Sequence, residues 1–591
     1  MKKGLLFVIL FLVMFLYACS ETQEDRGIFF NFKNEEELLS FIEKESQGLS
    51  YDYRNDVIAE DSVGEEKEAS APDHSETNVE YDGVDEGDII KATPEGVYLV
   101  CDNILYFVDK DGERMGEVQL EKEFHFDEIY ITDEKIYVIG ENFFYFNFPF
   151  REGIESNHEK NYNYSKTLLT TVDRESLKIS DNLFVSGSKI GTRMIKENIY
   201  IFTSDYRWNR EDGKSILPFY NLNRSENKIL PNSVYHLENS NINGFTTFWT
   251  YNVENKKVSN LTFLGTFWNN QISIDERGIY ASKVFYENRS VDFDDAVSNW
   301  WGYREKSKML ALHFDDEGVP FIFDVFEFKG RVLNQFSIDK YEGHLRFATT
   351  EGWGESLVNR LYIFQKTENE YRKVSLIDEG LGKPRESIRS VRFDGHLATV
   401  VTFEIIDPFY VIDLTNPATP EILGELEITG FSTYQHHWKN DLVLGVGYET
   451  DDRGIINGIK ISLYDISDKF NPVEAVSPFV IERQGWSHSE ALFNHRALLV
   501  MEERNLIGFS VNDWKWNEGK YQFVSKYYLL EISEDEIKEK TTFTTGEIFG
   551  ENHNGSIKRV VRVGENLFVF SSFGVSVHDR EGEIINVFAF K

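Results

Sequence analysis

A polar turn followed by a short apolar strand recurs nine times along this chain of 591 residues. The four clearest copies begin at Glu95, Glu134, Glu197 and Glu565 and read EGVYLV, EKIYVI, ENIYIF and ENLFVF. Weaker copies begin near Glu276, Glu342, Asp394, Lys439 and Asn494. Each copy is followed by a second strand that ends in a polar turn, as in LYFVD at 105–109. Such irregularly spaced repeats suit four-stranded units with loop insertions of different length.

One four-stranded unit cannot bury both of its faces, so the units must stack around an axis, and closure of the ring removes the exposed ends. Aromatic residues make up 15% of the chain, which favours strands over helices. We therefore predict an all-β fold, a single β-propeller at 77–591. Nine units are counted, but propellers typically have eight blades or fewer, so we predict about eight four-stranded blades, within a range of seven to nine. Two smaller β domains are the alternative.

The N-terminus predicts export. Two lysines precede an apolar run at 5–16, which is shorter than the roughly 20 residues that a membrane-spanning helix needs. Residues 1–18 therefore form a signal peptide. Its end, LYAC at 16–19, resembles the lipobox, in which the cysteine is acylated and becomes the new N-terminus, although Tyr17 replaces the usual small residue. We expect lipid on Cys19; an ordinary secretory signal with an incidental cysteine is the alternative.

Between the signal and the propeller we expect three segments. Residues 19–33 form a tether, and 34–46 form a short amphipathic helix with Asn34 as its cap and Glu37 completing a capping box. Residues 47–76 are acidic, lack apolar periodicity and form a linker. The second of the two cysteines, Cys101, lies in an apolar predicted strand and is expected to be a buried, inert thiol.

Charge restricts the partners. The chain has 62 basic and 100 acidic residues, a net charge of −38 that repels phosphate backbones, so we expect no nucleic-acid binding. The lipid would supply the membrane affinity. We expect a monomer on the extracytoplasmic face of a bacterial membrane.

Four carboxylates, those of Asp82, Asp85, Glu86 and Asp88, lie within seven residues at the entrance to the first blade. Hard oxygen ligands at this density are a candidate Ca²⁺ site. The alternative is a turn at Asp82 and Gly83, with the other carboxylates capping it or pairing with basic residues across the blade junction.

Four histidines form a second candidate site: His436, His437, His488 and His495. Neighbouring blades could bring them to one rim, where imidazoles would bind Zn²⁺, Cu²⁺ or another ligand. Turn or core positions are the alternative.

Five tryptophans occur in long polar insertions: Trp208, Trp300, Trp301, Trp514 and Trp516. An exposed aromatic surface of this kind would suit a sugar or a protein partner. Alternatively, the insertions fold back and bury these rings over the blades.

Several motifs resemble, in order, those of the secreted proteins with a C-terminal β-propeller domain distantly related to WD40 repeats. They are TNVEYDGVDEGDIIK at 77–91, LRFATT at 345–350, SVRF at 390–393, DPFYVIDL at 407–414, LGELEITGFS at 423–432, IKISLYDISD at 459–468 and SEAL at 489–492. The resemblance implies a fold and an exported location but no activity. The chain has YQHH at 434–437 where the family pattern reads YLHP, so the turn set by that proline is absent.

The motifs of common enzyme classes are missing from the sequence: HExxH, GxSxG, CxxC and the phosphate-binding glycine-rich loop. These enzyme classes lack positive support, although propeller enzymes often assemble their sites from loops of separate blades. Because a propeller supplies a rigid disc with adaptable loops, we expect a non-catalytic binding or scaffolding module for a protein, peptide or glycan at the cell envelope. The alternative is an extracytoplasmic hydrolase or metal-dependent oxidoreductase with its site at the central channel of the propeller.

Overall fold

The computed structural model describes residues 28–29, 32–46, 73–142, 165–205, 217–237, 242, 244–265, 272–288, 303–404, 407–483, 486–517, 520–550 and 553–590. The predicted signal peptide, Cys19 and most of the predicted linker lie outside these residues. Within the described part of the chain, every helix is too short or too polar to cross a bilayer.

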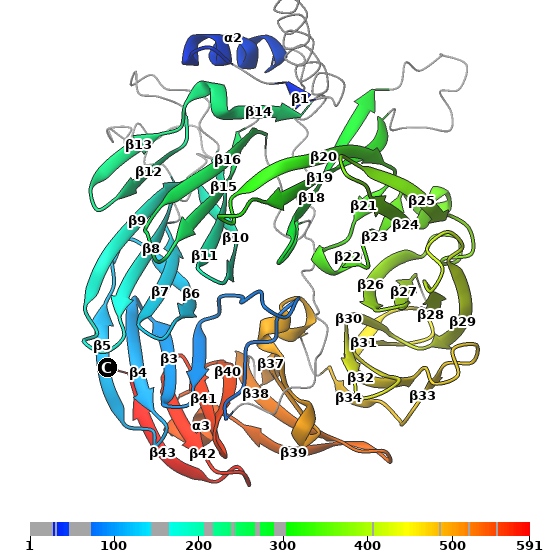
Figure 1. The fold of residues 1–591 in the computed structure, drawn as a ribbon. Coiled ribbons are helices and arrows are strands. Elements are labelled where there is room, and N and C mark those ends of the chain that lie inside the picture. The colour runs from blue at the N-terminus through cyan, green and yellow to red at the C-terminus, as the bar shows by residue number, and fades with distance from the viewer. Residues whose placement is uncertain are drawn as a thin grey trace, which may run out of the picture.

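Nine consecutive sheets form a ring, with the last sheet beside the first (Figure 1). Blade 1 is built from β2 (Ile90–Thr93), β3 (Gly96–Cys101), β4 (Ile104–Asp109) and β5 (Arg114–Gln119). Blade 2 is built from β6 (His125–Ile131), β7 (Lys135–Glu141), β8 (Lys166–Asp173) and β9 (Ile179–Ser186). Blade 3 is built from β10 (Ser188–Ile195), β11 (Asn198–Asp205), β15 (Phe245–Asn252) and β16 (Val258–Leu264). Blade 4 is built from β17 (Ile272–Asp275), β18 (Gly278–Asn288), β19 (Tyr303–Phe314) and β20 (Pro320–Phe328). Blade 5 is built from β21 (Arg331–Val332) and β22 (Ile338–Tyr341), which together form its first strand, and from β23 (His344–Glu351), β24 (Val358–Lys366) and β25 (Tyr371–Ile377). Blade 6 is built from β26 (Ser387–Asp394), β27 (Leu397–Phe403), β28 (Asp407–Asp413) and β29 (Glu421–Ile428).

Blade 7 is built from β30 (Phe431–Trp438), β31 (Leu442–Thr450), β32 (Ile456–Asp465), β33 (Val473–Glu474) and β34 (Phe479–Glu482). Blade 8 is built from β35 (Trp486–His488) and β36 (Leu499–Met501), which together form its first strand, and from β37 (Leu506–Asn517), β38 (Lys520–Ile532) and β39 (Ile537–Phe543). Blade 9 is built from β40 (Ile557–Val563), β41 (Asn566–Ser571), β42 (Gly574–His578) and β43 (Ile584–Ala589). The short helices are η2 (Pro231–Ser233), η5 (Gln335–Ser337), η6 (Gly354–Ser356), η7 (Glu490–Leu492), η8 (His495–Ala497), η9 (Glu502–Arg504) and α3 (Thr545–Phe549).

The predicted all-β propeller is confirmed, and its blades number nine rather than eight, within the predicted range. Each repeat of the sequence belongs to its own blade, so the number of copies equals the number of blades. Eight copies begin at the second strand of a blade. The copy near Asn494 instead falls on η8, and the second strand of blade 8 begins at Leu506.

Nine apolar clusters hold the ring together, one at each junction between neighbouring blades. The cluster that closes the ring combines Val97 and Val108 of blade 1 with Phe568 and Val577 of blade 9. Cys101 belongs to this cluster and is buried, as predicted, and burial raises the pKa of its thiol. Each blade is thus covered by apolar side chains on both faces, as the stacking argument requires.

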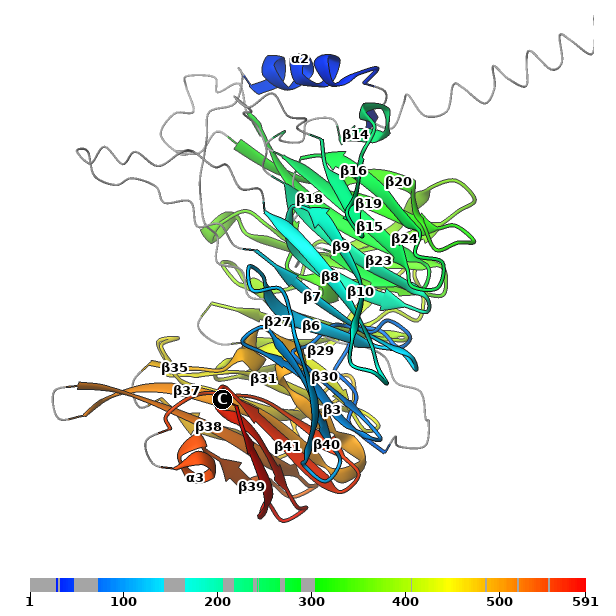
Figure 2. The same cartoon turned by 90° about the vertical axis from the view of Figure 1, so that its left-hand side faces the viewer.

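The strands of each blade run up and down, which separates two rims. The first and second strands, and the third and fourth, are joined by short turns at one rim, which we call the turn rim. The second and third strands are joined at the other, the insertion rim, which carries the long connections at 143–164, 206–244 and 289–302. Figure 2 shows the hairpin β37–β38, formed by the second and third strands of blade 8, projecting from the ring.

Asp-x-x-Gly sequences shape three turns between third and fourth strands. Asp109 Oδ1 accepts hydrogen bonds from the amides of residues 111 and 113, and Gly112 has a φ of 85°. Asp315 with Gly318 and Asp579 with Gly582 repeat this arrangement. An acidic side chain satisfies the turn amides while glycine adopts the left-handed conformation, so sequence alone sets these hairpins.

The N-terminal elements attach to the outer edge of blade 3. The long insertion after β11 supplies β12 (Phe219–Leu222) and β13 (Ser225–Lys228) to blade 2, and β14 (Val234–Leu237) to blade 3. Strand β1 (Ile28–Phe29), within the segment expected as a tether, pairs with β14. Helix α2 (Glu35–Ser46) follows and buries Leu38 and Ile42.

The start of α2 is capped by the two predicted side chains. Asn34 Oδ1 accepts from the amide of Glu37 at 2.9 Å. The Glu37 carboxylate accepts from the amide of Lys33 at 2.6 Å, one residue before the amide that a standard capping box would use.

Candidate functional site

The segment Thr77–Lys91, which carries the first family-like motif, crosses the centre of the ring (Figure 1). We call it the central segment. It forms isolated β-bridges with two inner strands, through Asp85 to Met194 of β10 and through Asp88 to Ile129 of β6. The preceding residue His74 forms a third bridge, to Val563 of β40. The first strand of the ring is therefore reached only after the chain has passed the inner edges of other blades.

Side chains extend these contacts to further blades. Asn78 donates to the Tyr434 hydroxyl of blade 7 at 2.9 Å and to the His495 carbonyl of blade 8 at 3.2 Å. The Tyr81 hydroxyl donates to the Ile338 carbonyl of blade 5 at 3.1 Å. A single stretch of chain thus links the inner edges of blades that are hundreds of residues apart.

Three of the four carboxylates predicted as calcium ligands pair with cations. Asp85 accepts from Lys91 at 2.5 Å. Glu86 Oε2 lies 3.5 Å from Arg193 and 3.1 Å from His495 Nε2. Burial acts to raise the pKa of Glu86, but Arg193, His495 and Arg496 outweigh it and hold this pKa well below its usual range.

Asp88 accepts from Arg559 Nε at 2.9 Å, and Asp82 is an exposed residue of the turn that includes Gly83, whose φ is 79°. Among the residues that the structure describes, no three His, Cys, Asp or Glu side chains are grouped so that they could hold a metal ion. Calcium binding at these carboxylates stays a prediction, and Ca²⁺ would have to displace Lys91, Arg193 and Arg559.

Glu80 is a functional candidate that the sequence did not single out. Its side chain is 1% exposed, and its Oε1 accepts from the Ser273 hydroxyl at 2.5 Å. Lys340 Nζ donates to the same hydroxyl at 2.7 Å. Burial raises the pKa of Glu80 to about 8, against the opposing effects of Lys340 and Arg193. Burial at the centre of the ring therefore favours the protonated form of Glu80.

Besides Lys91 at its own end, the cations that contact the central segment come from positions scattered over more than 350 residues: Arg193, Lys340, Arg496 and Arg559. Lysine and arginine are common on exposed strands, and no local pattern marks these five as inward-facing. Glu80, by contrast, lies inside the TNVEYDG motif, and its place between two apolar residues was the available signal.

The four candidate histidines contact different residues in the structure. His436 and His437 are adjacent in β30, so their side chains point to opposite faces of the sheet. His437 Nδ1 lies 3.0 Å from Asp394 Oδ2, and this hydrogen bond raises the pKa of His437. Burial, with smaller effects of Arg392 and His437, lowers the pKa of His436 to about 3.

The other two histidines belong to blade 8. His488 stacks on Phe493, with ring centroids 4.8 Å apart, and burial lowers its pKa. His495 faces Glu86, as described above. A metal or ligand site shared by the four histidines stays a prediction.

The candidate tryptophans are only partly described. Trp208, Trp300 and Trp301 lie outside the described residues, as does the side chain of Trp516. Trp514 is 43% exposed on the projecting hairpin, and its ring lies 5.1 Å from that of Phe523. Trp353, in the connection between β23 and β24, is 67% exposed.

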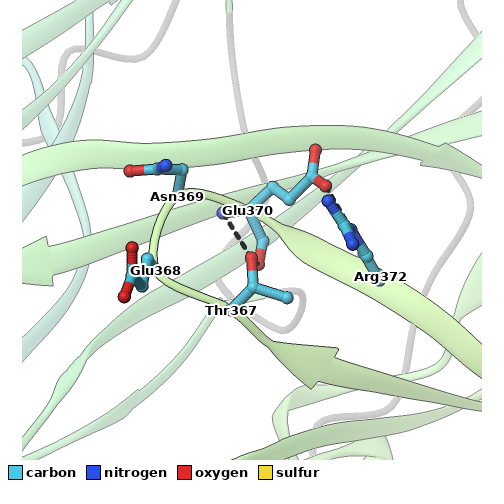
Figure 3. Close-up of a pocket in the computed structure, with 5 residues that line it drawn as sticks. All are labelled: Thr367, Glu368, Asn369, Glu370 and Arg372. Atoms are coloured by element: carbon cyan, nitrogen blue, oxygen red, sulfur yellow. Dashed lines mark hydrogen bonds and ion pairs between the residues drawn. The ribbon is translucent and has the colours of Figure 1, made fainter.

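A recess on the turn rim is lined by five residues of the single hairpin β24–β25, Thr367, Glu368, Asn369, Glu370 and Arg372 (Figure 3). The Thr367 hydroxyl donates to the Glu370 carbonyl at 2.8 Å, and the Glu370 carboxylate pairs with Arg372. These side chains thus bond to other groups of the same hairpin. The residues that line the recess come from one blade only, whereas the central segment contacts several blades, so the central segment is the stronger candidate site.

Known proteins resemble this chain to different extents. An uncharacterized protein of Archaeoglobus fulgidus is 39% identical over 197 residues, which cover 33% of this chain and 28% of the relative. An uncharacterized protein of Methanocaldococcus jannaschii is 28% identical over 403 residues, which cover 64% of this chain and 59% of the relative. The chain thus spans less than two thirds of either relative.

Among solved structures, the C-terminal WD40 domain of Sif2 is 11% identical with a TM-score of 0.28, and the match covers 55% of this chain and 73% of that domain. The model of the β-propeller domain family matches residues 74–582, which include the central segment and strands of all nine blades. The chain therefore belongs to the β-propeller domain family.

Proposed function

We propose that this protein is a lipoprotein, held by lipid on Cys19 at the extracytoplasmic face of a membrane, whose propeller binds or scaffolds a protein, peptide or glycan of the cell envelope. The occupied centre of the ring carries the proposal. The central segment fills the position where an enzyme of this shape would collect groups from several blades, and Glu86 and Asp88 pair there with arginines. This arrangement supports a rigid disc that meets its partners through its rims.

The N-terminus supports the anchored location. The apolar run and the ending LYAC at 16–19 resemble those of a lipoprotein signal, and nine residues after Cys19 the chain joins blade 3 through β1. A short connection between the lipid and a folded element keeps the disc close to the membrane surface.

The anchor is tested with the full-length chain, expressed in a bacterium that processes lipoproteins and fed an alkyne fatty acid. Wild-type protein is expected to carry the label and to sediment with membranes, and Cys19→Ser should lose the label. Cys101→Ser, which removes the buried thiol, is the matched control and should keep it. Label that persists in Cys19→Ser would contradict the assigned attachment site.

The binding role is tested by photo-crosslinking in intact cells, with the photoreactive residue at Phe470 or Asp111 of the turn rim and, as a control, at the buried Phe568. A discrete adduct from the rim positions alone supports a specific envelope partner. The same products from all three positions, or none from the rim, would argue against this role.

A hydrolase is the second candidate, favoured by the contact of Ser273 with Lys340. Burial lowers the pKa of Lys340, opposed by Asp275 and Glu80, and a lysine of lowered pKa can activate a serine. Ser273 itself is fully buried, so the central segment would have to move first. A fluorophosphonate probe forms a phosphorus–oxygen bond to a nucleophilic serine hydroxyl while its fluoride leaves and the hydroxyl proton passes to a base. It should then label wild type and Ser282→Ala but not Ser273→Ala. An unlabelled wild type would reject this candidate.

A further inference from the structure

Three exposed large apolar side chains lie at the insertion rim. Trp353 lies in the connection between β23 and β24, and Ile455 lies in the connection between β31 and β32. Trp514 lies in β37, in the part of this strand that pairs with β35 as well as β38. They are 67%, 53% and 43% exposed. The Arg331 guanidinium lies 4.7 Å from the centroid of the Trp353 ring. Tryptophan beside arginine is a combination typical of the membrane–water interface.

The N-terminal elements attach at this same rim. Strand β14 pairs in parallel with Thr262–Leu264, the last residues of β16, and Leu264 lies opposite Phe245, the first residue of β15. Because β15 follows the long insertion of blade 3, these residues mark the insertion end of the blade. Ile28 pairs with Leu237, one residue further in that direction.

The chain length outside the structure limits where the lipid can be. Cys19 precedes Ile28 by nine residues, which span at most about 30 Å when fully extended. The membrane that receives the lipid must therefore pass within that distance of the insertion end of blade 3.

The turn rim carries clustered negative charge. Four of its turns between third and fourth strands each carry three carboxylates: Asp109, Asp111 and Glu113; Asp315, Asp316 and Glu317; Glu534, Asp535 and Glu536; and Asp579, Glu581 and Glu583. Such clusters are repelled by the anionic lipids of a membrane surface. Electrostatics therefore orients the turn rim away from the bilayer.

We propose that the ring lies with its insertion rim on the membrane, so that Trp353, Ile455 and Trp514 contact the lipid interface. This inference rests on the proposed lipid anchor and deepens it, because it names the lipid surface as the partner of one rim. The acidic turn rim then faces outward, and it is the surface left for an envelope partner.

The test uses full-length acylated protein on phosphatidylcholine vesicles, with a single environment-sensitive fluorophore introduced through Trp353→Cys, Trp514→Cys or Phe470→Cys. Phe470 is a matched control because it is 67% exposed, like Trp353, but belongs to the turn rim, in the connection between β32 and β33. Quenching by lipids that carry a nitroxide is expected to be several-fold stronger at positions 353 and 514 than at 470. Thermal melting checks that each labelled variant is folded.

The outcomes separate this inference from the proposed anchor. Protein that floats with the vesicles but is quenched equally at 353 and 470, or more strongly at 470, overturns the orientation and leaves the anchor standing. Acylated protein that does not float overturns both. Flotation that persists in Cys19→Ser, with quenching at 353 and 514, would show that the rim binds lipid without the acyl chain. The orientation would then stand without depending on the anchor.

Discussion

Asp88 and Arg559, 471 residues apart in the chain, form a buried ion pair at the centre of the ring, with Arg559 Nε 2.9 Å from Asp88 Oδ2. The same guanidinium binds both carboxylate oxygens of Glu490, at 2.9 and 3.0 Å. One arginine of the last blade therefore ties the entrance of the first blade to blade 8.

Replacing this arginine should cost far more stability than replacing an exposed one. Arg559→Met leaves a buried carboxylate without its cation and is expected to lower the free energy of unfolding by about 3–5 kcal/mol. Arg504→Met, which breaks an exposed pair with Glu565, should cost at most about 1 kcal/mol. Urea unfolding of the two variants checks this, and equal losses would contradict a structural role for the central pair.

Glu80 makes stability fall as the pH rises. Its pKa is about 8 in the folded protein against an ordinary 4.5, so the folded state keeps a proton that the unfolded chain releases between these values. The contribution of Glu80 to the free energy of unfolding is fully present below about pH 4.5. It is lost as the pH rises from there to about 8, by at most about 1.4 kcal/mol per pH unit.

Glu80→Gln should remove this dependence, so the difference in unfolding free energy between wild type and variant is expected to change across that window. Glu368→Gln, at an exposed turn, is the control. A difference that stays constant from pH 4.5 to 8 would show that Glu80 is ionised in the folded protein.

His436 should act in the opposite direction. Its pKa is lowered from 6.5 to about 3, so the unfolded chain takes up a proton below pH 6.5 that the folded protein refuses. The stability contributed by the neutral imidazole is present above pH 6.5 and is lost as the pH falls towards 3. His436→Gln should flatten this acid loss in urea titrations, and His344→Gln, at the start of β23, is the control.

Gly447 of β31 leaves no room for a side chain. A Cβ there would lie 1.8 Å from the Phe431 carbonyl oxygen, so Gly447→Ala must push two paired strands apart and is expected to lose about 3 kcal/mol or more. Gly546, in α3, has no atom within 4 Å of an added Cβ, and Gly546→Ala should gain about 0.5–1 kcal/mol. Thermal unfolding of both variants tests this, and similar midpoints would contradict the close approach.

The paired carboxylates also predict the response to metal removal. Because Asp85, Glu86 and Asp88 already contact protein cations, EDTA is expected to leave the melting temperature of the full-length chain unchanged. Elemental analysis of protein purified without chelator provides the second measurement. A stoichiometric calcium whose removal lowers the melting temperature would instead establish the metal site.

The sequence by itself determined the repeating β architecture, since the apolar strands, Asp-x-x-Gly turns and aromatic content are local properties that each blade repeats. It also marked the segment 77–91 as distinctive, and it placed a capped helix at the position of α2. The nine copies in the sequence match the nine blades, which lie within the predicted range of seven to nine.

Only the tertiary structure decided what the distinctive segment does. The cations that pair with its carboxylates come from blades 1, 3 and 9, Arg496 of blade 8 binds the carbonyl of Gly87, and ring closure alone brings Arg559 to Asp88. The raised pKa of Glu80 likewise depends on burial among residues of several blades. Such contacts join residues hundreds of positions apart, and their electrostatic energy depends on distance and solvent exclusion, which a linear pattern does not contain.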